Sequence, residues 1–123
     1  MKHKVTQEQY EILMKAAKAL DEQGVRSIGP DNRGCLYRGP DDNKCFIGHI
    51  IPDEEYDVEM EDLCVADLID TFGNVVKGFE GQENLKLLDH LQDHHDLERL
   101  WKRERGDNPN AMQDYVKKMV EVV

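Results

Sequence analysis

The chain has no long hydrophobic run. Its longest, residues 45–51, is interrupted by Gly48 and His49. That is far short of the roughly 20 apolar residues that a membrane-spanning helix requires. Residues 1–8 also lack the apolar stretch of a secretory signal. We therefore predict a cytoplasmic protein with no membrane segment.

Cysteine is scarce, with three residues and no C-x-x-C pair. An odd number without an export signal favours reduced thiols, and the spacing supports neither a zinc ribbon nor a thioredoxin-like redox site. The chain also lacks a glycine-rich phosphate loop, a G-x-S-x-G elbow, an H-E-x-x-H motif and a dinucleotide-binding fingerprint. These absences favour a protein that is not an enzyme and has no cofactor or bound metal.

Basic residues are outnumbered, with 16 Lys and Arg against 26 Asp and Glu, for a net charge of −10. The excess is concentrated in residues 31–100, which hold eighteen acids and six bases, whereas residues 1–30 and 101–123 each carry +1. Such a field repels nucleic acid and anionic lipid and attracts basic protein surfaces. Direct nucleic-acid binding is therefore disfavoured.

What the chain does contain is typical of a folded domain, since 39% of its 123 residues are hydrophobic and 34% are charged. This length favours one hydrophobic core that needs no staple or metal. No linker or low-complexity tract divides it. We predict a single compact domain over residues 1–123.

Helix signals are clear near both ends. Thr6 and Gln9 have capping-box spacing, apolar residues then recur at helical intervals, and Gly24 suits a helix C-terminus. Further apolar stripes predict a short helix over 65–72 and one or two helices between 85 and 106. Asn108-Pro109 predicts the start of a last helix.

Two segments, 35–38 and 45–51, flank a turn at 39–44 and have the composition of strands. We interpret them as a β-hairpin that ends at Pro52. The predicted fold class is α+β, with a small antiparallel β-hairpin or sheet packed with about four helices.

The acidic block at 53–62 is the most suggestive functional feature. In it, four carboxylates, Glu55, Asp57, Glu59 and Glu61, alternate with Tyr56, Val58 and Met60. On an extended strand the carboxylates would share one face at a spacing of roughly 6.6–7 Å, which is close to the intervals between phosphates. The other interpretation is a solvated first helical turn beginning at Pro52.

Three other groups of residues are weaker candidates. His90 and His94 lie four apart on a predicted helix and could share a metal, with Asp93, His95 and Asp96 nearby. Cys45 and His49 could form a thiol site. The Gly-Pro-Asp repeat at 29–31 and 39–41 could build a cation loop from Asp31, Asn32, Asp41, Asp42 and Asn43, although it lacks EF-hand spacing.

The middle of the chain contains two blocks of residues that form a recognisable pattern. They are Cys35-Leu36-Tyr37-Arg38-Gly39-Pro40-Asp41, Lys44-Cys45, Gly48, Ile51-Pro52-Asp53, Tyr56 and Glu59, followed by Leu91-Gln92, His95-Asp96 and Trp101. This pattern resembles that of small uncharacterised proteins of tailed phages and prophages. The resemblance covers 35–60 and 85–101. It implies a small accessory protein that acts inside an infected bacterial cell.

These observations lead to one functional hypothesis. A non-enzymatic phage accessory protein would bind the basic surface of a host protein and inhibit a nucleic-acid-handling or defence system, as anti-CRISPR, anti-restriction and DNA-mimic proteins do. The predicted partner-binding residues are Glu55, Tyr56, Asp57, Glu59, Met60, Glu61 and Asp62. The alternatives are a small metal- or thiol-dependent enzyme, and an oligomerisation module that uses Met112, Tyr115 and Met119.

Overall fold

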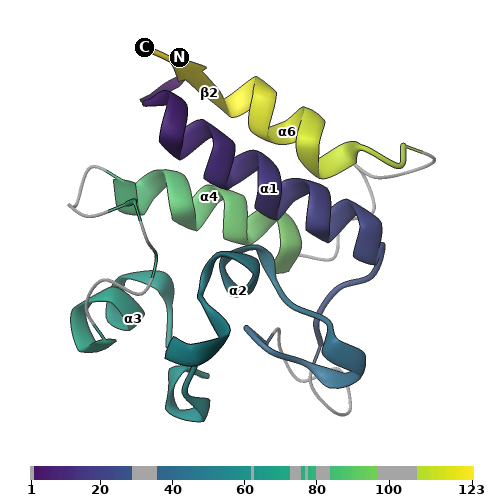
Figure 1. Cartoon of the computed structure of the whole chain (residues 1–123), viewed down its shortest axis with the longest axis vertical. Helices are drawn as coiled ribbons and strands as arrows, with labels where there is room; N and C mark the ends of the chain where they lie inside the picture. Colours follow the sequence, from purple (N-terminus) through teal and green to yellow (C-terminus); the bar gives the residue numbers. More distant parts are fainter. Residues whose placement is uncertain are drawn as a thin grey trace.

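The structure, a computed structural model, describes residues 2–28, 36–61, 63–72, 76, 78–79, 84–96 and 108–123, with backbone only for Pro40 and residues 94–96. Figure 1 shows α6, α1 and α4 running across the molecule above α2 and α3. In chain order the elements are β1 (His3–Val5), α1 (Gln7–Gln23), η2 (Pro40–Asp42), α2 (Phe46–Ile50), η3 (Asp53–Glu55), η4 (Val58–Met60), α3 (Val65–Phe72), α4 (Leu85–Asp96), α6 (Ala111–Met119) and β2 (Val120–Val122).

Helix α1 begins and ends where the sequence predicts. The Thr6 hydroxyl accepts a bond from the Gln9 backbone N–H at 3.1 Å, and the Gln9 side chain accepts one from the Thr6 N–H at 3.0 Å. Gly24 ends the helix with a φ of 72°, the left-handed conformation that glycine adopts without strain. Leu13, Ala17 and Leu20 are fully buried, so the predicted stripe is confirmed.

Helix α6 begins at Ala111, two residues after Pro109, and its first turn is capped from a distant part of the chain. The Asp21 carboxylate accepts backbone bonds from Met112 at 2.9 Å and Gln113 at 3.0 Å. The N-cap residue Asn110 makes no capping bond of its own. A side chain near the end of α1 therefore supplies the acceptors that a helix N-terminus needs.

The strands of the structure are not the predicted hairpin. In the described part of the chain, the sheet is the parallel pair β1–β2, in which His3 is opposite Val120 and Val5 is opposite Val122. Of the predicted hairpin, the described residues retain an isolated antiparallel bridge between Arg38 and Lys44. The fold is thus mostly helical with a small parallel sheet, which is α+β only in a loose sense.

Residues 46–50 form helix α2, so the strand predicted at 45–51 is wrong. The Cys45 Sγ accepts a bond from the Gly48 N–H at 3.3 Å and caps the helix, whose buried residues pack on α1 and α4. A Cβ on Gly48 would clash with the Tyr37 carbonyl oxygen. Glycine at this position therefore permits a close approach between α2 and the backbone of Tyr37.

Buried side chains from both strands and from α1, α2, α3, α4 and α6 form one hydrophobic cluster. Met112 of α6 is fully buried in it, and Tyr115 and Met119 pack partly buried against it. The stripe proposed for oligomerisation therefore faces the interior of the molecule. None of the described helices combines the length and apolarity required to cross a bilayer.

Candidate functional site

The acidic block folds as two single turns joined by extended residues. Asp53–Glu55 forms η3 and Val58–Met60 forms η4, with Tyr56, Asp57 and Glu61 in extended conformation around them. Alternation along a strand is therefore lost, and the row of carboxylates predicted for an extended segment is wrong. The alternative of a solvated turn after Pro52 describes η3 correctly.

The predicted partner-binding residues divide between surface and interior. Asp57 and Glu59 are exposed, and Glu55 and Tyr56 are partly buried. Met60 is fully buried in the hydrophobic core, so it cannot anchor a partner as predicted. Glu61 binds groups of this chain, and Asp62 lies outside the described residues.

Glu61 connects the acidic block to the segment before η2. Its carboxylate accepts backbone bonds from Tyr37 at 2.9 Å and Arg38 at 3.1 Å, and a bond from the Tyr56 hydroxyl at 2.6 Å. Three donors on one carboxylate make Glu61 a structural acceptor. Its negative charge is therefore directed inward.

Tyr56 lies between this carboxylate and a guanidinium. The Arg38 guanidinium carbon is 4.9 Å from the centre of the Tyr56 ring, within cation–π range. Burial, together with the hydrogen bond to Glu61, raises the pKa of Tyr56 to about 12. The ring thus holds Arg38 in place while its hydroxyl holds Glu61.

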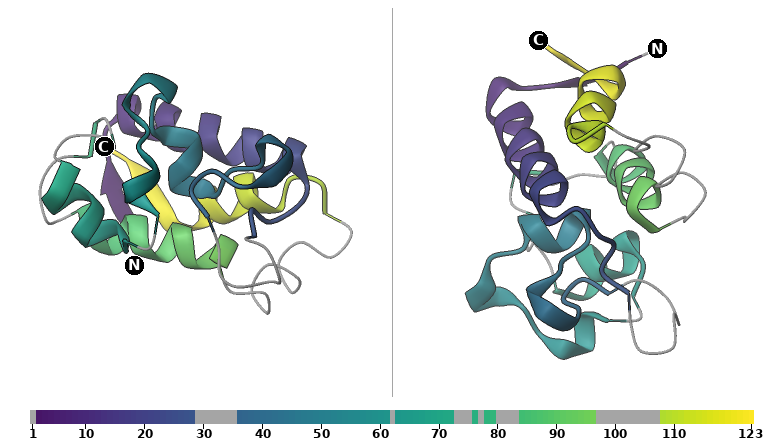
Figure 2. Two further views of the ribbon diagram at one scale, coloured as in Figure 1. Left: turned by 90° about the horizontal axis from the view of Figure 1, so that it is seen from below. Right: turned by 90° about the vertical axis from the view of Figure 1, so that its right-hand side faces the viewer.

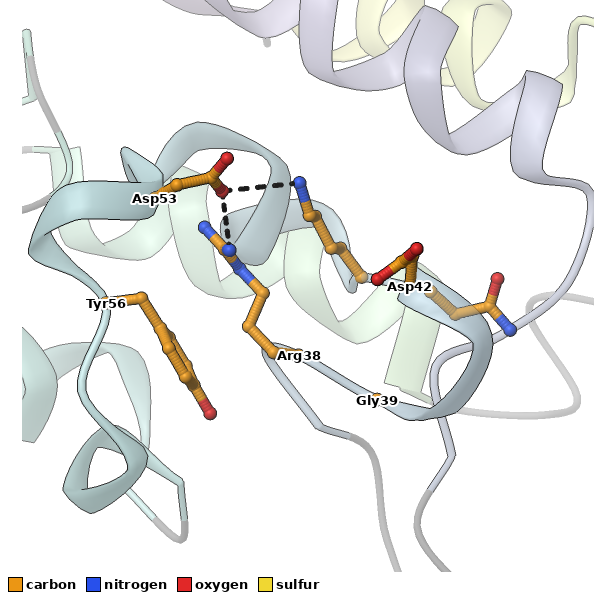
Figure 3. Close-up of a pocket in the computed structure, with 7 residues that line it drawn as sticks. Arg38, Gly39, Asp42, Asp53 and Tyr56 are labelled. Atoms are coloured by element: carbon orange, nitrogen blue, oxygen red, sulfur yellow. Dashed lines mark hydrogen bonds and ion pairs between the residues drawn. The ribbon is translucent and has the colours of Figure 1, made fainter.

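Arg38 and Lys44 converge on Asp53 at the rim of a polar cavity of about 560 Å³ (Figure 3). Asp53 Oδ1 is 2.6 Å from Arg38 Nη1 and 3.6 Å from Lys44 Nζ. The hydrogen bond from Arg38, together with the Lys44 charge, lowers the pKa of Asp53. Arg38 Nη2 also donates to the Ile51 carbonyl at 2.7 Å.

The turn that carries these two bases is fixed by the end of α1 and the residues after it. The Gln23 side chain bonds both the N–H and the carbonyl of Lys44, at 2.8 and 2.9 Å. The Asn43 carbonyl accepts from the Gly39 N–H at 2.7 Å and from the Ser27 hydroxyl at 3.2 Å. Asp41 and Asp42 complete the turn with φ values of 59° and 60°.

The consequence is a strongly acidic exterior over residues 36–72. This stretch contains eleven acids and two bases, a net −9, and both bases are directed at Asp53 with side chains only 18% and 28% exposed. Seven other acids among the described residues of the stretch are exposed: Asp41, Asp42, Glu54, Asp57, Glu59, Asp67 and Asp70. The charge asymmetry seen in the sequence therefore corresponds to one part of the molecule.

Val58 is the residue that sequence reasoning missed. It is 73% exposed and lies between exposed Asp57 and Glu59 on η4. Alternation assigned it to the same side as Tyr56 and Met60. The tight turn places Met60 inward and Val58 outward, and no local signal distinguishes the two apolar residues.

The alternative catalytic groups find little support among the described residues. Cys45 is fully buried, and His49 Nε2 lies 3.1 Å from Gln23 Oε1. No group of three His, Cys, Asp or Glu side chains with metal-binding geometry occurs within the part of the chain that the structure describes. The side chains of His94, His95 and Asp96 lie outside that part, as do Asp31 and Asn32 of the predicted cation loop.

No protein-family model, curated protein or solved structure shows significant similarity to the chain. The resemblance to tailed-phage accessory proteins accordingly stays a prediction.

Proposed function

We propose that this chain is a non-enzymatic accessory protein of the tailed-phage type that binds a basic, nucleic-acid-binding surface of a host protein. One observation carries this proposal. Arg38 and Lys44, the two bases of residues 36–72, both form ion pairs with Asp53, while seven further acids among the described residues of this stretch are exposed. A surface with this imbalance attracts partners that normally bind phosphates.

The contact is centred on η4. Val58 offers an exposed apolar side chain flanked by the carboxylates of Asp57 and Glu59, and Glu54 is exposed on the preceding turn. An apolar centre with a charged rim is a common arrangement in protein interfaces. Tyr56 and Glu61 support this surface from within, because they bond each other and the Tyr37–Arg38 backbone.

The mechanism is competition with nucleic acid. Carboxylates that occupy a groove built for phosphates exclude DNA or RNA without any chemical step. Electrostatic attraction raises the association rate and weakens as salt increases. The partner class is therefore a nuclease or related enzyme with a basic groove, such as a CRISPR effector, a restriction enzyme or a repair nuclease.

The test is displacement of a fluorescent DNA duplex from purified enzymes of these three classes. We expect displacement from at least one enzyme at about 50 mM salt. Direct binding of the chain to that enzyme, measured without DNA, should be at least tenfold weaker at about 200 mM, because salt screens the attraction between the two charged surfaces. Absence of displacement from all three at low salt would contradict the proposal.

A matched pair of variants separates the effect of the acidic surface on η3 and η4 from the effect of net charge. The triple change Glu54→Lys, Asp57→Lys and Glu59→Lys should abolish displacement. The triple change Glu11→Lys, Glu22→Lys and Glu121→Lys alters the net charge by the same amount at exposed sites on α1 and β2. This control variant should retain most of the DNA displacement. Equal activity of the two variants would rule out η3 and η4 as the contact surface.

A further inference from the structure

A second cavity, of about 320 Å³, lies on the part of the molecule that carries the chain ends. It is lined by Lys2, His3, Lys86, Leu87, His90 and Met119. Its size is at the low end of the range for small-molecule sites. Figure 2 shows the two strands side by side at this end of the molecule.

The polar side chains of this cavity come from α4, from β1 and from Lys2, the residue before β1. Lys86 and His90 are four residues apart on α4, so they lie on one face of the helix. His3 belongs to β1, and its pairing with Val120 in the parallel sheet places it near the end of α6. The cavity therefore lies between the paired chain ends and α4.

The lining is basic in a protein whose net charge is −10. Among the residues that the structure describes, no Asp or Glu lines it, and neither Lys2 nor Lys86 forms an ion pair. Asp89 and Asp93, on the same helix, are not among the lining residues. Two ammonium groups that have no ion-pair partner in the described part of the chain and two imidazoles thus line one hollow.

Apolar atoms line the same hollow. Leu87 is 2% exposed and held in the hydrophobic core, and Met119 packs partly buried against it. Lysine ammonium groups and imidazole N–H groups are donors suited to phosphate oxygens, and an apolar wall suits an organic substituent. The combination matches a small phosphomonoester, whereas a long nucleic acid would be repelled by the acidic remainder of the chain.

We propose that this cavity binds a small organic phosphate, with Lys2, Lys86 and the two histidines around the phosphate and with Leu87 and Met119 against the organic group. This site is independent of the acidic surface on η3 and η4. Its ligand would bind at a separate place from a protein partner.

The probe is phenyl phosphate, titrated into the full chain and followed by calorimetry and by amide chemical shifts. We expect saturable binding at millimolar or lower concentration, with the largest shifts at His3, Lys86–His90 and Met119. Inorganic phosphate should bind more weakly, because it cannot contact Leu87 and Met119. Equal affinity for phenyl phosphate and inorganic phosphate would contradict the proposed contact of the organic group with Leu87 and Met119.

Lysine variants test the site directly. Lys86→Ala should weaken phenyl phosphate binding about tenfold, the size expected for the loss of a charge-assisted hydrogen bond. Lys18→Ala, on an exposed position of α1, should leave binding unchanged. Both substitutions are at exposed helical positions and should preserve the circular-dichroism spectrum. Two results would overturn the proposal. One is binding that does not saturate at about 10 mM phenyl phosphate, because the dissociation constant would then lie well above the millimolar range. The other is an equal loss of affinity in the Lys86→Ala and Lys18→Ala variants.

Discussion

Tyr56 shows how a single residue can support an acidic surface without being part of it. Its hydroxyl donates to Glu61 at 2.6 Å, and its ring lies against Arg38. Ionisation would place a phenolate beside a carboxylate in a partly buried site. This is why burial and Glu61 raise the pKa of Tyr56 from 10.0 to about 12.

This shift makes stability depend on pH in the alkaline range. Because the folded state holds the Tyr56 proton more tightly, its contribution is complete below pH 10 and is lost as pH rises toward about 12. We expect the urea-unfolding free energy to fall more steeply between about pH 9.5 and about pH 11.5 in the natural chain than in Tyr56→Phe. Parallel pH curves for the two proteins would show that Tyr56 is not the responsible group.

At the scale of elements, helix α6 depends on Asp21 of α1. Asp21 is 9% exposed and accepts two backbone bonds and one side-chain bond from the first turn of α6. Asp21→Ala leaves buried N–H groups without an acceptor and should reduce the unfolding free energy by about 1–3 kcal/mol.

Urea unfolding at neutral pH measures this loss. The neighbouring exposed Glu22→Ala is the matched control and should change the free energy by less than about 0.5 kcal/mol. If both substitutions had the same small effect, α6 would not require the cap from α1.

At the scale of the whole molecule, charge is unevenly distributed. Residues 36–72 carry −9 of the net −10, and their two bases are both directed at the same carboxylate. The remaining like charges repel one another across this part of the surface, at a cost that salt reduces.

Salt should therefore stabilise the protein. Raising sodium chloride from about 0.05 to about 0.5 M should increase the unfolding free energy by about 1 kcal/mol. The neutralised variant Glu54→Gln, Asp57→Asn, Glu59→Gln should gain less from the same change. A larger or equal gain in this variant would mean that repulsion on η3 and η4 is negligible.

The sequence by itself determined the elements whose signals are local. The capping residues and apolar stripe of α1, the short helix α3 and the beginning of α4 follow from helical spacing and cap chemistry over neighbouring residues. The acidic excess between residues 31 and 100 also needed no structure, because charge adds along the chain regardless of conformation.

Tertiary structure alone decided which side chains reach solvent and which segments pair. An apolar run of seven residues fits a buried helix or a strand equally well, and packing of α2 on α1 and α4 selected the helix. The strands β1 and β2 are three residues each and lie at opposite ends of the chain, so local pattern carries no trace of their pairing. Glu61 points inward because Tyr37, Arg38 and Tyr56 donate to it, and those donors meet only when the chain folds.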